Sequence, residues 1–217
     1  MARNERDAAP RPPRQRGLVG TVLALIMGLL GVAVVALFVS VLVEWAGMAM
    51  DWWPTDHSLS MLLTERAYIE AIGDYPLTPL QPVELGALAI QKMDETISWA
   101  GVTTTTSIYM VSAINTMKLV ALRATLSLFA LPGYALVMLA AFFEGLVARD
   151  IRKYTGGHES SYIFHKAKRF ITPSVVLSIT VYLMLPFSLP PVLVFAPTML
   201  FAGLMVYIAT SRFKKFV

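Results

Sequence analysis

Long apolar runs alternate with polar segments along this chain. The first run, residues 17–43, contains no charged side chain. A helix needs about 20 apolar residues to cross the hydrocarbon core of a bilayer, so this run can span it even when tilted. It is far longer than the roughly 7–15 apolar residues of a secretory signal peptide, and no small-x-small cleavage motif follows it. The pattern therefore predicts an uncleaved membrane anchor.

Three further apolar runs follow, at residues 124–148, 171–189 and 191–210. Pro132 and Gly133 lie inside the first of these runs and predict a kink there, which a membrane helix tolerates when its neighbours satisfy the freed carbonyl groups. Only residues 188–191 separate the last two runs, and such a short connection joins antiparallel neighbours. We therefore expect an all-α integral membrane protein with four transmembrane helices, the last two forming a hairpin.

Residues 44–123, between the first two spans, show amphipathic periodicity instead. Apolar side chains at helical spacing predict a helix over residues 55–73, which ends at a glycine, and a second over residues 83–99. A third pattern starts near Ser107 and runs without a breaker into the next span. About 80 residues can form a small helical cap, but hardly an independent core. Its apolar faces either pack on one another or dock onto a partner.

Composition agrees with a membrane protein. Hydrophobic residues make up 56% of the chain and charged residues only 15%, well below the roughly 25% of a soluble domain. The mean hydropathy is +0.63. The chain contains no cysteine, which excludes disulfides and thiolate chemistry.

The charges are distributed unevenly, and this predicts the orientation. The tail 1–16, the loop 149–170 and the tail 211–217 hold 14 Lys and Arg against 4 Asp and Glu, whereas residues 44–123 hold 4 basic and 9 acidic residues. Basic residues are retained on the cytoplasmic side. We therefore expect both termini and the 149–170 loop inside the cell. The helical cap then lies outside, in the periplasm of a cell with two membranes.

The 149–170 loop contains two histidines that could suggest a metal site. His158 and His165 are seven residues apart, which on a helix is about 10.5 Å of rise, too far for two ligands of one ion. Glu159 lies between them, but no further His or Cys is available to complete a ligand set. Ser160 and Ser161 lack a nucleophile elbow and an identifiable base. We expect no metal, no cofactor and no enzymatic activity.

From Tyr162 onward, the pattern of the same loop predicts a basic amphipathic helix that leads into the third span. Its apolar face holds Ile163, Phe164, Ala167, Phe170 and Ile171. We expect it to lie in the cytoplasmic headgroup zone, where its charges anchor the protein to the lipid bilayer or dock an acidic partner. Direct nucleic-acid binding is not expected, because retention of positive charge inside the cell already explains these residues. The candidate docking residues are Tyr162, His165, Lys166, Lys168 and Arg169.

Glu144 lies about one turn inside the cytoplasmic end of the 124–148 run. A carboxylate within a span marks function by default. This one is close enough to the boundary to reach water or to pair with Lys166 or Arg169. Both a structural pair and a proton or ion path therefore remain open.

Three tryptophans follow the first span: Trp45, Trp52 and Trp53. Aromatic side chains are enriched at membrane–water interfaces, where one end of the ring system is apolar and the other is wet. The cluster therefore predicts an interfacial anchor on the outer side.

Four stretches resemble the integrating conjugative element membrane proteins, a family of about this length that carries a domain of unknown function. They are VEWAGMAMDWWP, HSLSMLLTERAYIEAI, RDIRKYTGGHESSYIFHKAKR and TSRFKKFV, of which the third is the most specific. The resemblance runs from about residue 16 to the C-terminus. At Asp51–Trp53 the chain departs from the aromatic or apolar residues expected before the Trp-Pro pair, which leaves the depth of that segment open.

The resemblance implies a multi-pass protein of the bacterial inner membrane that assists conjugative, type IV-like DNA transfer from an integrative element. Genes of this family commonly neighbour one for a TraD-type coupling ATPase, so this ATPase and other conjugation proteins are the implied partners. A homo-oligomer is compatible with the sequence. No catalytic residue is implied.

Two alternatives come from other classes of function. A small transporter or channel subunit requires a polar path through the spans, which apart from Glu144 offer only hydroxyl side chains such as Ser174, Ser178 and Thr180. The second alternative is an exclusion protein, which also acts in conjugation but blocks redundant transfer. Its loss would increase uptake by the recipient rather than reduce donation.

Overall fold

The computed structural model describes residues 18–72, 82–99, 107–155 and 161–213, and within these ranges all regular structure is helical. The helices are α1 (Leu18–Ala49), α2 (His57–Ile72), α3 (Pro82–Trp99), α4 (Ile108–Thr155), α5 (Ser161–Met184) and α6 (Pro191–Ser211). The expected all-α fold is confirmed.

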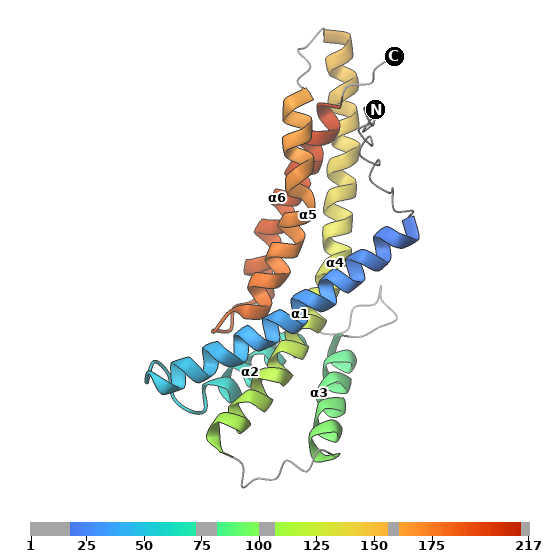
Figure 1. The fold of residues 1–217 in the computed structure, drawn as a ribbon. Helices are drawn as coiled ribbons and strands as arrows, with labels where there is room; N and C mark the ends of the chain where they lie inside the picture. Colours follow the sequence, from blue (N-terminus) through green and yellow to red (C-terminus); the bar gives the residue numbers. More distant parts are fainter. Residues whose placement is uncertain (1–17, 73–81, 100–106, 156–160, 214–217) are drawn as a thin grey trace, which may run out of the picture.

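Helices α4, α5 and α6 form an elongated bundle (Figure 1). The α5–α6 pair is an antiparallel hairpin, and α4 packs closely against α6. The close approach depends on glycine: a Cβ atom at Gly145 would lie 2.8 Å from Thr210 Cβ and 3.0 Å from the carbonyl oxygen of Tyr207. A Cβ atom at Gly203 would lie 2.9 Å from Val137 Cγ1. Small residues at helix contacts are typical of packing in membranes, where backbones must approach closely.

Helix α1 crosses this bundle at a wide angle instead of running alongside it (Figure 1). Its middle contacts the end of α5, where Ser40 Oγ donates to the carbonyl oxygen of Leu183 over 3.2 Å and Ala36 is fully buried. The length of the apolar run left room for such a tilt.

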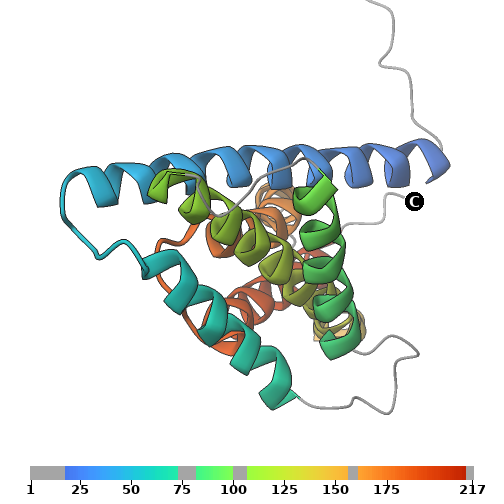
Figure 2. The same cartoon turned by 90° about the horizontal axis from the view of Figure 1, so that it is seen from below.

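Helix α4 joins two parts of the molecule. Its 48 residues extend about 72 Å, more than twice the roughly 30 Å thickness of a hydrocarbon core. Viewed from below, α1, α2 and α3 surround its N-terminal part (Figure 2). Its C-terminal part packs with α5 and α6. The cap expected over residues 44–123 and the bundle therefore share one continuous helix.

Three helices of the described ranges are long and apolar enough to cross a membrane: Met27–Ala49, Ile108–Thr155 and Pro191–Ser211. Helix α5 is not among them, because its first ten residues carry the basic cluster. It ends at Met184, five residues before the end of the expected 171–189 span. The helix stops there because Pro186 disfavours helical geometry at the preceding residue.

Helix ends follow local chemistry. Asp51 adopts a φ of 54°, a left-handed conformation that Asp tolerates, and the Trp52 amide donates to the carbonyl of Gly47 over 2.9 Å to close the end of α1. Pro191 occupies the first turn of α6, where its missing N–H has no helical partner to lose.

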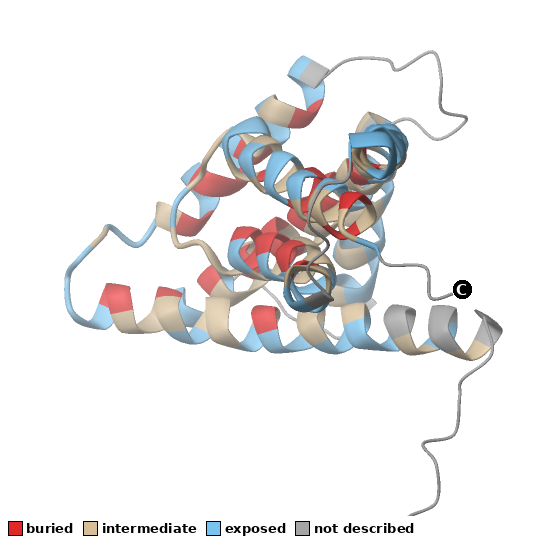
Figure 3. Ribbon diagram, turned by 90° about the horizontal axis from the view of Figure 1, so that it is seen from above, coloured by how far each residue is buried: buried red, intermediate tan, exposed pale blue. Residues whose placement is uncertain are grey.

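The core runs between the helices, with exposed residues outside it (Figure 3). Its centre is aromatic: Tyr134, Tyr182 and Phe195 are 1%, 0% and 4% exposed. The ring of Phe195 lies edge-on to both tyrosines, with centroid distances of 6.5 and 5.1 Å. These contacts fix α4, α5 and α6 against one another.

Candidate functional site

The basic segment expected to lie flat at the membrane surface is the first third of α5. Helix α5 runs without a break from Ser161 to Met184, so this segment extends along the bundle and not across it (Figure 1). Ala167 on its inner side is 4% exposed. Phe170, also on the predicted apolar face, is 44% exposed. The protein itself therefore covers only part of the predicted apolar face.

Four of the five candidate docking residues line one surface hollow of about 560 Å³, together with Phe170. We call it the α5 hollow, and its lining is Tyr162, His165, Lys166, Arg169 and Phe170. The Nζ atom of Lys166 lies 5.7 Å from the centre of the Tyr162 ring, a cation–π distance. The structure therefore brings most of the predicted set together.

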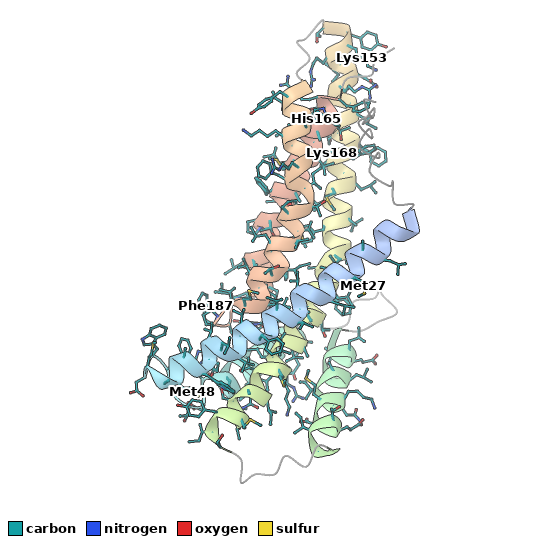
Figure 4. The ribbon with its side chains drawn as sticks, viewed as in Figure 1. Met27, Met48, Lys153, His165, Lys168 and Phe187 are labelled. Atoms are coloured by element: carbon teal, nitrogen blue, oxygen red, sulfur yellow. The ribbon has the colours of Figure 1, made fainter. Side chains whose placement is uncertain are left out.

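Lys168 is exposed but does not line the hollow. At 3.6 residues per turn, it projects from α5 roughly a third of a turn away from the centre of the hollow. In Figure 4, Lys168 and His165 lie near Lys153 at one end of the molecule, far from Met48 and Phe187. The cations of α5 therefore form two faces at the same end of the bundle.

The neighbouring basic residues of α4 are engaged in contacts within the protein. Arg152 Nη1 donates to the carbonyl oxygen of Ser211 over 2.5 Å, which ties the ends of α4 and α6 together. Lys153 pairs with Asp150 over 3.0 Å, and the guanidinium of Arg149 lies 5.7 Å from the Phe213 ring centre. By contrast, none of the α5 cations has an acidic partner among the described residues.

Glu144 is exposed on α4. Within the described part of the chain, no ion pair joins it to Lys166 or Arg169. The structural pairing considered for Glu144 is therefore not found.

The three tryptophans have different surroundings. Trp45 Nε1 donates to the carbonyl oxygen of Tyr109 over 2.9 Å, which links α1 to α4. Trp53 stacks on the His57 ring at 4.7 Å between centroids. Trp52, at 68% exposed, is the most exposed of the three, and the other two are half-buried. The anchor role stays a prediction, and Trp52 is the side chain best placed for it.

A buried ion pair joins α2 to α4. Arg123 Nε donates to Glu65 Oε1 over 3.0 Å, and the two side chains are 1% and 0% exposed. The Tyr182 hydroxyl of α5 donates to Glu65 Oε2 over 2.7 Å. Arg123 Nη1 and Nη2 donate to the carbonyl oxygens of Leu185 and Phe187 over 2.5 and 2.9 Å. Both charges are thus paired and hydrogen-bonded, as burial requires.

This network connects the cap to the bundle, and we did not expect it from the sequence. In the sequence, Glu65 and Arg123 were counted only among the charges of residues 44–123. One signal was available, because Glu65 lies four residues from Met61 and from Ile69, on the buried face of α2. A buried acid needs hydrogen-bond donors or a cation as partners, so a partner for Glu65 could be expected.

A second polar cluster joins α1, α2 and α4. His57 Nδ1 lies 3.0 Å from Glu44 Oε2, and Ser112 Oγ donates to Glu44 Oε1 over 3.4 Å. A cavity of about 10 Å³ lies between this cluster and the buried ion pair, lined by both Glu44 and Arg123. That volume is close to the minimum for one water molecule. The two clusters together fix α1 and α2 to α4, and α2 to the end of α5.

Hydroxyl groups form a third polar cluster inside the bundle. The Tyr134 hydroxyl lies 2.6 Å from Ser178 Oγ and 2.5 Å from Thr198 Oγ1. These groups satisfy one another across α4, α5 and α6. In the described ranges no charged side chain bonds to them, so this cluster resembles an interhelical contact more than a polar path.

A groove of about 580 Å³ lies between α2, α3 and α4. Its floor includes Ile69 and Leu122, which are 3% and 1% exposed. The charges on its rim are paired within the protein: Arg66 Nε lies 3.1 Å from Glu70 Oε1, and Asp94 pairs with Lys118. Part of the apolar surface of the cap is therefore self-packed, and part stays open in this groove.

Across the described ranges, no group of three or more His, Cys, Asp or Glu residues could hold a metal ion. His158 and Glu159, which we considered as ligands in the sequence, lie outside the described residues.

Comparison with known proteins gives one match. A family model described as "IncC plasmid conjugative DNA transfer protein DtrJ-like" matches residues 77–214, well over half of the chain. The match includes the α5 hollow, Arg123 and Tyr182, and begins after Glu65. No curated protein and no solved structure matches the chain.

Proposed function

The chain belongs to the DtrJ-like family of conjugative DNA transfer proteins, and from this premise we propose that it is an inner-membrane accessory protein that holds parts of a transfer complex together. Family membership confirms the expected connection with conjugation. The narrower expectations stay predictions: an integrative element as carrier, a type IV-like apparatus and a TraD-type coupling ATPase as partner. The role requires contacts and no catalytic step.

In this proposal the bundle axis crosses the membrane, with both termini and the start of α5 inside the cell and the cap helices in the periplasm. The charge asymmetry supports this orientation. Helix α1 supplies a tilted fourth crossing, since its N-terminal end is inclined toward the end of the bundle that carries His165 (Figures 1 and 4).

The observation that carries the proposal is the set of α5 cations without acidic partners among the described residues. Neighbouring basic residues on α4 are used for packing within the protein. Exposed, unpaired cations at one end of a bundle favour contact with a negatively charged surface. His165, Lys166, Lys168, Arg169 and Tyr162 are the proposed contact residues inside the cell, and the α2–α3–α4 groove offers a contact surface outside it.

A deletion in the donor cell, scored by transfer frequency, tests the function. We expect transfer to fall by at least tenfold and to recover when the wild-type gene is supplied.

A charge reversal of Lys166 and Lys168 to Glu should lower transfer without lowering the amount of protein in the membrane. A photo-crosslinker at position 165 should capture a conjugation protein, with the coupling ATPase as the first expectation. Normal transfer together with no such adduct would contradict the proposal.

The exclusion-protein alternative can be distinguished from the accessory role by deleting the gene in the recipient cell instead of the donor. An exclusion protein acts in the recipient, so its loss there should increase uptake and leave donation unchanged. The transporter alternative requires an open polar path. The hydroxyls of Tyr134, Ser178 and Thr198 instead close on one another, which favours the accessory role.

A further inference from the structure

The α5 hollow combines positive charge with an aromatic rim. Lys166 and Arg169 carry permanent charge, and His165 lies beside them. Within the described part of the protein these side chains make no ion pair, and Lys166 Nζ lies 5.7 Å from the centre of the Tyr162 ring. A cationic hollow of this kind favours a small anion such as a phosphate group.

An exposed apolar stripe continues from the hollow along the same face of α5. Phe170, Leu177 and Val181 are 44%, 63% and 44% exposed. Together with the exposed Pro173, they recur every three or four residues after Lys166. That spacing keeps side chains on one face of a helix. The stripe therefore begins directly after the cations along α5, on the same face of the helix.

The length of this stripe matches one leaflet of a membrane. From Arg169 to Val181 the helix rises about 18 Å at 1.5 Å per residue. Half the hydrocarbon thickness of a bilayer is about 15 Å. A cationic head followed by an apolar strip one leaflet long has the dimensions of a single phospholipid.

We propose that the α5 hollow binds an anionic phospholipid, whose phosphate contacts Lys166 and Arg169 and whose acyl chain lies along Phe170, Leu177 and Val181. A free phosphate or an acidic protein segment would use the cations but would leave the apolar stripe unused. The inference rests on the proposed function in one respect, the position of the start of α5 at the inner face of the membrane. Lys168, on the other face, is left for contact with a protein.

Native mass spectrometry of the purified full-length protein, titrated with phosphatidylglycerol or phosphatidylcholine, tests the site. We expect tighter binding of phosphatidylglycerol and a loss of about fivefold in affinity for each cation removed, from Lys166→Gln and Arg169→Gln. Lys168→Gln is the matched control. It removes the same charge from the same part of α5 and should leave lipid affinity unchanged. A melting curve of each variant checks that the fold is intact.

Three results would overturn the inference: no preference for phosphatidylglycerol, an equal loss in Lys168→Gln, or displacement of the lipid by millimolar glycerol 3-phosphate. Transfer assays with the same variants separate this inference from the proposed function. Unchanged lipid binding with reduced transfer would show that the hollow contacts a protein and that the lipid site is wrong. Lost lipid binding with normal transfer would support the lipid site and contradict the docking role.

Discussion

Buried charges decide the arrangement of the cap at the level of single residues. The Arg123 guanidinium is bonded to Glu65 and to two backbone carbonyl oxygens, and it also lies 5.5 Å from the Tyr182 ring centre. Glu65 comes from α2, and the other partners come from the end of α5 and the segment that follows it. A buried ion pair is weak evidence for stability as a whole, but removal of one partner leaves an uncompensated charge.

Arg123→Met should therefore lower the free energy of unfolding by about 3–5 kcal/mol, because the Glu65 carboxylate stays buried without its cation. Thermal or urea unfolding in detergent measures the change. Replacement of both partners, Arg123→Met with Glu65→Leu, should recover part of the loss, since no buried charge then remains.

Arg66→Met is the matched control, because this arginine also pairs with a glutamate but its side chain is 62% exposed. Exposed pairs of this kind contribute about 0.5 kcal/mol or less. If the Arg123 variant loses no more stability than the Arg66 variant, the buried pair does not hold the cap to the bundle.

At the level of elements, the contact between α4 and α6 depends on the absence of side chains. Gly145 faces backbone atoms of α6, so a Cβ atom there meets groups that cannot rotate away. A Cβ atom added at Gly31 on α1 would instead meet no atom within 4 Å. Glycine is therefore needed for close helix packing at position 145 and has no such role at position 31.

Gly145→Ala should destabilise the protein by about 1–3 kcal/mol, because α4 and α6 must separate to accept the methyl group. Gly31→Ala should be neutral or stabilising by up to about 1 kcal/mol, since alanine favours helix and meets nothing. Melting temperatures of the two variants, compared with wild type, measure the difference. Equal effects of the two substitutions would exclude a close α4–α6 contact at Gly145.

At the level of the whole molecule, α4 makes the cap and the bundle continuous. The start of α5, which carries the cations, and helices α2 and α3, which line the groove, lie toward opposite ends of α4 (Figure 1). A contact made at one end is therefore connected to the other by a single helix and by the Arg123 network. This arrangement suits a protein that holds components on both sides of a membrane.

The natural absence of cysteine makes the proposed orientation directly testable. Leu88→Cys on α3 and Tyr162→Cys on α5 replace side chains that are 53% and 72% exposed. A membrane-impermeant maleimide should label position 88 in cells with a permeable outer membrane, and position 162 only after the inner membrane is opened. Leu136→Cys, at a site 69% exposed within the apolar part of α4, should resist labelling in both cases. The reverse pattern at positions 88 and 162 would contradict the orientation.

Local patterns in the sequence were sufficient for several features. Continuous apolar runs and helical periodicity predicted an all-α chain, and the prolines at 190 and 191 marked the connection between the last two helices. The apolar spacing after Tyr162 predicted that the segment carrying the candidate docking residues is helical, and it forms the start of α5. These features depend on interactions between residues close in the chain, so the chain itself contains the required information.

Only the tertiary structure decided the rest. Arg123 and Glu65 are 58 positions apart, and Tyr182 is 117 positions from Glu65, so no local periodicity connects them. The course of α1 depends on its packing against α4 and α5. The end of α5 at Met184 differs from the expected span because Pro186 follows it. The sequence by itself determined which segments are helical and apolar. Which charges are buried together, and which cations stay unpaired, depended on how those helices pack.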